Sequence, residues 1–375
     1  MNTNAVSKYP FYIKTTVILL GLVLLSYSLA SLRSVLVPPA FSLLLAILLN
    51  PLVNRLLKWR NSKVLAISLA LLLATVVMTG VGYFIYSQIS SFSSELPMFK
   101  TKFTELFEKF REYAAHRFSL SEKKQEELIA QAESGITPLI GTTIGNLAST
   151  ITVILLLPVY TFLFLYYKNL LLNFLYEVFS EKNSDNVEKI LAETKSTTQQ
   201  YTVGLLLEAL IVATMNSIVM LILGIDYAIL LGILGAVLNM LPFIGGLLSA
   251  ALPLIVATVT KDGFHTQVWI IACYLVIQFV DNHFLMPYIV SSRVKINALI
   301  SVLGVLMGGA LWGIPGMFLS IPFLGILKII FDRIPDLKSW GKLLGDTVPA
   351  RHKGELWHRV KAKVDETVDS KKSSK

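Results

Sequence analysis

The chain has 375 residues, of which 54% are hydrophobic and 15% are charged. Soluble globular domains carry about 25% charged residues, so this composition excludes an ordinary soluble protein and predicts an all-α polytopic membrane protein. The formal net charge of +9 indicates cytoplasmic loops that face anionic lipid rather than a nucleic-acid-binding surface. The one cysteine, Cys273, can form neither an internal disulfide nor a cysteine-based metal site.

The N-terminal part, residues 1–87, contains three stretches long enough to cross a membrane. They are Phe11–Leu32, Val35–Leu57 and Val64–Tyr86, and each offers the roughly 20 apolar residues that a bilayer core of about 30 Å requires. The first stretch resembles a signal peptide, but further spans follow directly after it, so we expect an uncleaved helix.

A polar segment, residues 88–145, separates the third span from the fourth, and we expect it to form a small extramembrane helical domain. Phe99, Phe103, Phe107 and Phe110 recur at helical spacing in it, which predicts an amphipathic helix. That helix either packs against another helix or subunit, or lies on the membrane surface.

Residues 146–200 supply the fourth membrane helix, Leu147–Tyr167, and a cytoplasmic linker. Orientation follows from short basic loops, which stay in the cytoplasm. The loop between the second and third spans carries Arg55, Lys58, Arg60 and Lys63. We therefore expect both termini in the cytoplasm, with residues 336–375 as a basic tail that rests on the inner leaflet or stays solvated.

Residues 201–335 form the expected transport unit, because two of its four apolar stretches are interrupted by proline and glycine. The four stretches are Val203–Leu223, Tyr227–Thr258, Phe264–Met286 and Asn297–Ile330. The second is broken at Pro242-Phe243-Ile244-Gly245-Gly246 and the fourth at Gly313-Ile314-Pro315-Gly316. Backbone groups freed by such breaks must face protein or a watery cavity within a membrane.

The two broken stretches have similar patterns, since Gly235, Leu238 and Pro242 recur as Gly308, Leu311 and Pro315 at an offset of 73 residues. Each stretch is either a re-entrant helical hairpin or a single kinked span, and we favour hairpins in inverted repeats. A matched pair of broken segments is typical of a transporter's binding site. We therefore expect the two breaks to enclose one shared polar pocket.

Ionisable and amide side chains are costly inside membrane segments, so they are candidates for function. With the residues of the two breaks they give one set of substrate- or ion-binding candidates. The set is Glu208, Asn239, Pro242, Gly245, Gly246, Asp281, Asn282, Gly313, Pro315 and Gly316. Asn216 is a further amide in the same span as Glu208.

Structural alternatives exist for these side chains. Glu208 can lie near enough to the interface to be solvated, and Asn239 can join neighbouring helices through hydrogen bonds. Asp281 can pair with Arg293 or Lys295 as a structural lock. The sequence contains no P-loop and no His-Glu-x-x-His motif, so we expect no enzyme, no cofactor and no metal site.

Three motifs resemble the AI-2E (autoinducer-2 exporter) family of bacterial transporters. They are Leu241-Pro242-Phe243-Ile244-Gly245-Gly246, the run from Asp281 to Val294, and the run from Gly308 to Pro322. The resemblance covers roughly Lys8 to Pro335. It implies about eight membrane segments, a homo-oligomer in the bacterial inner membrane, and either export of a small molecule or cation/proton antiport.

We therefore predict a secondary-active transporter that exports a small polar solute or signalling molecule, coupled to a gradient of protons or sodium. Glu208 or Asp281 would be the coupling carboxylate. One alternative is a cation/proton antiporter. An alternative of another class is a non-transporting membrane scaffold that acts through residues 88–145.

Overall fold

The computed structural model describes residues 10–59, 62–118, 147–178, 184–241, 245–261, 263–290 and 294–346. These residues are almost entirely helical, and their one β-contact is an isolated bridge between Ile296 and Gly345. Six of the described helices are long and apolar enough to cross a membrane, and four shorter helices are also apolar. The prediction of an all-α polytopic membrane protein is confirmed.

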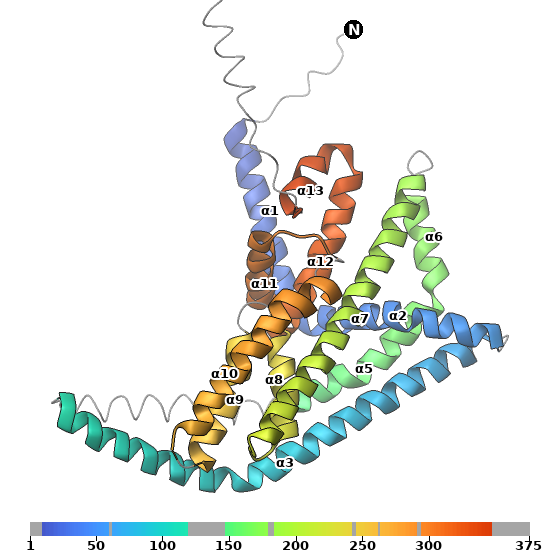
Figure 1. The fold of residues 1–375 in the computed structure, drawn as a ribbon. Helices are drawn as coiled ribbons and strands as arrows, with labels where there is room; N and C mark the ends of the chain where they lie inside the picture. The colour runs from blue at the N-terminus through green and yellow to red at the C-terminus, as the bar shows by residue number, and fades with distance from the viewer. Residues whose placement is uncertain are drawn as a thin grey trace, which may run out of the picture.

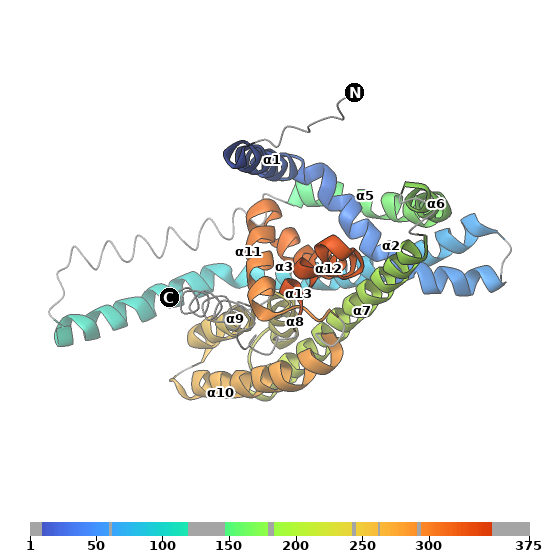
Figure 2. The ribbon, with the colours of Figure 1, turned by 90° about the horizontal axis from the view of Figure 1, so that it is seen from above.

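The N-terminal helices are α1 (Phe11–Ser31), α2 (Arg33–Trp59), α3 (Lys63–Phe118) and α5 (Leu147–Tyr166). Figures 1 and 2 show α3 as a long helix along one side of the molecule. Helices α2, α3 and α5 share an apolar core, whereas α1 has no buried residue among the described ones. Exposed apolar helix faces of this kind suit contact with lipid or with another chain.

Helix α3 continues past the expected end of the third span without a break. The first part of the predicted extramembrane domain, as far as Phe118, therefore continues the helix of the third span. The side chains of the phenylalanine stripe, and everything from residue 119 to residue 146, lie outside the described residues.

Helix α6 (Lys168–Val178) precedes α7 (Ser184–Ile222), which is 39 residues long. The predicted linker and the predicted fifth span thus share one continuous helix. Its N-terminal half is tied to the C-terminal half of the chain, because the Arg333 guanidinium donates to the Glu193 carboxylate at 2.8 Å.

The first broken stretch forms a helical hairpin from α8 (Ala228–Asn239) and α9 (Gly245–Thr260). The arms run antiparallel, since Gly235 faces Ser249 while Gly245 lies against the backbone of Leu238 and Asn239. Pro242 lies outside the described residues. With 12 residues, α8 is about 18 Å long, too short to cross a bilayer core.

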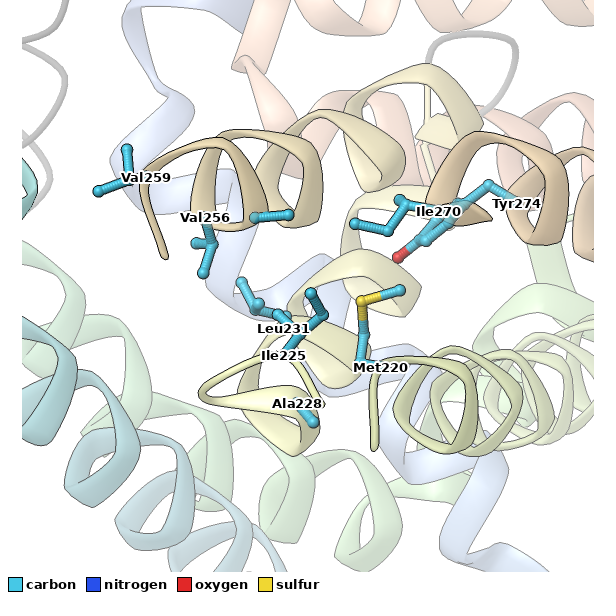
Figure 3. Close-up of a cluster of buried hydrophobic side chains, with 9 residues drawn as sticks. Met220, Ile225, Ala228, Leu231, Val256, Val259, Ile270 and Tyr274 are labelled. Carbon is cyan, nitrogen blue, oxygen red and sulfur yellow. The ribbon is translucent and has the colours of Figure 1, made fainter. Parts of the chain in front are cut away.

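Apolar packing fixes this hairpin against its neighbours. Figure 3 shows the cluster, in which side chains of α8 and α9 meet Met220 at the end of α7. Ile270 and Tyr274 of α10 (His265–Val280) complete the cluster. The hairpin is therefore held between α7 and α10.

The predicted span Phe264–Met286 consists of α10 and a π-helix, η2 (Asp281–Val290), which contains Pro287. Proline removes the backbone donor of the normal α-helical ladder, and π-segments inside helices are frequent at functional sites. The change of helix type begins at Asp281, a candidate site residue.

The second broken stretch is also a hairpin, formed by α11 (Ala298–Trp312) and α12 (Ile314–Arg333). Gly313 turns the chain with a φ of 65°, a backbone conformation that favours glycine. Gly308 packs directly on the backbone of Gly316 and on the hydroxyl of Ser320. The short helices η4 (Pro335–Leu337) and α13 (Lys338–Leu344) follow and fold back onto α12.

The two hairpins share a close contact between a glycine on the first arm and a serine on the second, Gly235 with Ser249 and Gly308 with Ser320. The glycines are the pair related by the offset of 73 residues. Their surroundings differ, however, because the second hairpin packs on α1, α2 and α7 rather than on α10. In that position the Trp312 indole donates to the Leu29 carbonyl at 2.8 Å.

Candidate functional site

A pair of buried carboxyl groups lies where α7 meets the π-helix. Glu208 is 1% exposed and Asp281 is 3% exposed, and the two carboxyls are within hydrogen-bonding range of each other. No lysine or arginine pairs with either carboxyl among the described residues, Lys295 included; Arg293 lies outside that set. No basic side chain among the described residues therefore neutralises the pair.

A chain of amide hydrogen bonds holds the Asp281 carboxyl of this pair in place. The Asn239 Nδ2 donates to Asp281 Oδ2 at 2.8 Å, and the Gln278 Nε2 donates to Asn239 Oδ1 at 2.8 Å. One oxygen on each acid, Glu208 Oε2 and Asp281 Oδ1, has no hydrogen-bond partner in the described protein. A buried polar atom of this kind needs a partner from water, an ion or a solute.

The first break places these groups through its glycines. A side chain at Gly246 would collide with the carboxamide of Gln278, and a side chain at Gly245 would collide with the backbone of Asn239. Because both glycines lack a Cβ atom, the start of α9 can approach α8 and α10 closely enough for the amide chain to form. The glycines of the first break thus shape the site, because they allow the three helices to pack closely.

An open groove of about 650 Å³ reaches the carboxyl pair at Asp281, whereas Glu208 is not among its lining residues. Its polar lining comes from Asn239, Gln278, Asp281 and Asn282, and its apolar lining from α9, α10 and Met286. A small number of polar groups on an otherwise apolar wall is typical of sites for small ligands.

A second polar cluster lies next to the first, around Gly235. A Cβ atom there would approach Asn216 Nδ2 at 3.1 Å, Tyr274 Oη at 3.3 Å and Ser249 Cβ at 3.5 Å. The Asn216 amide and the Tyr274 hydroxyl are buried without a hydrogen-bond partner in the described protein. Polar groups therefore continue along the interface of α7, α8, α9 and α10.

The second break has a different position. Neither Gly313, Pro315 nor Gly316 lines the groove, which takes its lining residues from Asn239 to Leu254 and from Ile271 to Met286. Among the described residues, which leave out residues 242–244 of the first break, this groove therefore takes no lining from the second break. Within the second hairpin, Gly308 and Gly316 meet backbone to backbone and leave no space between the arms at that point.

The structure thus brings six of the predicted site residues together, namely Glu208, Asn239, Gly245, Gly246, Asp281 and Asn282. Pro242 lies outside the described residues. Sequence reasoning missed Gln278 and Tyr274, which both lie in α10. The available signal was their spacing, because Tyr274, Gln278 and Asp281 lie four and three residues apart and share one helix face.

Glycine at position 204 allows α7 to approach the π-helix. An alanine Cβ there would overlap the backbone carbonyl of Ile289, which no side-chain rotation can relieve. We expect Gly204→Ala to lower the free energy of unfolding by about 1–3 kcal/mol, measured as a lower melting temperature in detergent. Gly21→Ala is the matched control, because nothing lies within 4 Å of its added Cβ; equal melting temperatures for the two variants would contradict the prediction.

The model of the AI-2E transporter family matches residues 15–336. The chain belongs to this family. It is 26% identical over 342 residues to the AI-2 transport protein TqsA of Escherichia coli (strain K12), with 88% of this chain and 95% of the relative covered. It is also 22% identical to the putative transport protein YrrI of Bacillus subtilis (strain 168), over 80% of this chain and 86% of the relative.

Membership of the AI-2E family confirms the resemblance found in the motifs. The family match begins in α1 and ends just after α12, so it includes both hairpins and every residue of the site. The relatives are named as transport proteins or permeases, which points to a membrane transporter rather than an enzyme.

Proposed function

We propose that this AI-2E family member is a secondary-active transporter of the bacterial inner membrane that exports a small polar solute in exchange for protons or sodium. The observation that carries the proposal is the Glu208–Asp281 pair, which is buried, has no cation partner among the described residues, and reaches an open groove through Asp281. Buried ionisable groups in membrane segments face bundle interiors or pathways and mark ion or substrate routes.

The proposed chemistry of coupling rests on the contact between the two buried acids. Two carboxylates in contact inside a protein cannot both remain ionised, so the pair holds one shared proton when its site is closed. Opening toward water or binding a cation releases that proton. Asn239 and Gln278 fix Asp281 through the amide chain, so that proton exchange happens at a defined position.

The groove offers the binding surface for the exported solute. Asn239, Gln278 and Asn282 present amide donors and acceptors, which suit a solute with hydroxyl or carbonyl groups. A signalling molecule such as AI-2, for which the relative TqsA is named, is one such solute. Alternating access would move the α8–α9 hairpin against α7 and α10.

Cation/proton antiport is the second candidate function. The same site provides two carboxyls and amide oxygens, which are ligands that hard cations prefer. In that case the free oxygens of Glu208 and Asp281 would bind the cation itself.

The functional unit is proposed to be a homo-oligomer with both termini in the cytoplasm. The apolar side chains of α1, which remain exposed along its length, offer a face for a second copy of the chain or for lipid, and the basic loop between α2 and α3 is the basis for the orientation.

Residues 88–145 are the part through which a scaffold would act. A deletion of residues 119–146 that left transport intact would favour transport over the scaffold alternative.

The proposal is tested by neutralising each acid separately as Glu208→Gln and Asp281→Asn in proteoliposomes. An imposed gradient of sodium or potassium is expected to drive proton movement in the wild type, read by an internal pH dye. This rate should be at least tenfold lower in each variant. Asp226→Asn is the control, because Asp226 is an exposed carboxylate at the turn between α7 and α8; unchanged rates in both site variants would remove the pair from the mechanism.

A further inference from the structure

Three lysines gather at the junction of α2, α3, α6 and α7, away from the carboxyl pair. Lys168 begins α6, Lys63 begins α3 and Lys195 lies on α7. Burial, together with the charges of Lys195 and Lys63, lowers the pKa of Lys168. No carboxylate pairs with any of the three among the described residues. The cluster therefore has unbalanced positive charge.

A buried amide lies within this cluster. The Lys168 ammonium donates to Asn50 Oδ1 at 3.0 Å, while Asn50 Nδ2 has no partner in the described protein. Asn50 is 5% exposed, so its free donor is not satisfied by bulk water. A buried N–H donor next to several cations calls for an acceptor with negative charge.

Lys63 is held at the edge of the same cluster. Its ammonium donates to the Tyr166 carbonyl at 2.6 Å and lies 5.3 Å from the centre of the Tyr166 ring. An ammonium has three donors, so Lys63 keeps further donors for a ligand. The contact positions the charge at the C-terminus of α5.

An apolar hollow begins beside Lys168. It occupies about 330 Å³ in the angle between α5 and α6 and is lined by Tyr160, Leu163, Phe164, Tyr167, Leu170 and Leu171. Tyr167 directly precedes Lys168 in the chain. A ligand with a negative headgroup and an apolar tail would match the two neighbouring surfaces.

We propose that Lys63, Lys168, Lys195 and Asn50 bind the phosphate of an anionic phospholipid whose acyl chain occupies the hollow between α5 and α6. Basic pockets between membrane helices on the cytoplasmic side bind anionic headgroups, and the short basic loop between α2 and α3 predicts that side for this cluster. The bound lipid would join the N-terminal helices to α7, which carries Glu208.

The test is a lipid titration of the full-length protein in detergent, followed by native mass spectrometry. Phosphatidylglycerol is expected to bind more tightly than phosphatidylcholine with the same acyl chains. Because one cation near a charged membrane surface contributes about 1 kcal/mol, Lys168→Gln should weaken phosphatidylglycerol binding about fivefold. Lys168→Arg should keep the wild-type affinity, since it keeps the charge.

Two further variants make the result decisive. Lys195 is exposed, so Lys195→Gln should weaken phosphatidylglycerol binding without disturbing packing, whereas Lys189→Gln, on the same helix, should not. Equal binding of the two lipids, or no loss in either site variant, would overturn the proposal. Displacement of phosphatidylglycerol by an equal concentration of inorganic phosphate would show a site for free anions and would also overturn it.

Discussion

Replacing Gly245 with alanine is expected to abolish proton-coupled transport while Gly82→Ala leaves it unchanged. The added Cβ at position 245 would overlap the Leu238 carbonyl oxygen and lie 2.7 Å from the Asn239 Cα. Both obstacles belong to the backbone, so the arms of the first hairpin must separate. Asn239 would then lose its position against Asp281.

The measurement is ion-driven proton movement in proteoliposomes, compared at equal amounts of inserted protein. Overpacking of this kind costs about 1–3 kcal/mol, and misplacing a site by about 1 Å commonly costs a hundredfold in rate. Gly82 lies in a helix with nothing within 4 Å of its added Cβ, so Gly82→Ala measures the effect of the substitution without a steric clash. Wild-type transport by Gly245→Ala would show that close approach of the hairpin arms is not required.

Asn239→Leu is expected to destabilise the protein by about 2–4 kcal/mol, the second large effect. The substitution removes the donor to Asp281 and the acceptor for Gln278, and it leaves the buried Asp281 Oδ2 without its amide donor. Thermal unfolding in detergent measures the change.

A double-mutant cycle isolates the contact. In an Asp281→Leu background the same Asn239→Leu change should cost less, because the acid that required the amide is absent, and the coupling free energy should reach about 1–3 kcal/mol. Additive effects of the two substitutions would mean that Asn239 stabilises the hairpin independently of Asp281.

The hairpins could be predicted from sequence because their causes are local. Proline and glycine at each break interrupt the helix wherever the segment lies in the fold. The candidate acids could also be found, since Glu208 and Asp281 stand out in otherwise apolar segments. Their proximity could not, because it depends on how α7 crosses the π-helix, and Gly204 alone did not indicate that crossing.

Other features depend on tertiary packing and were missed. Gln278 and Tyr274 lie in an apolar run in which a lone amide or hydroxyl usually joins neighbouring helices, so neither stood out. The π-helix at Asp281–Val290 changes the direction of every side chain in it, and only Pro287 indicated an irregularity. The second break resembled the first in sequence, yet its glycines close the arms against each other.

The shared proton of Glu208 and Asp281 is most directly tested by infrared spectroscopy of the purified protein in lipid. At neutral pH the wild type is expected to show the carbonyl stretch of one protonated carboxyl group that exchanges slowly with deuterated water. That band should shift in frequency in each of Glu208→Gln and Asp281→Asn, because the remaining buried acid keeps the proton in a changed environment, should disappear in the double variant, and should persist unchanged in Asp226→Asn. A wild-type protein without the band, or a band that survives in the double variant, would contradict the account.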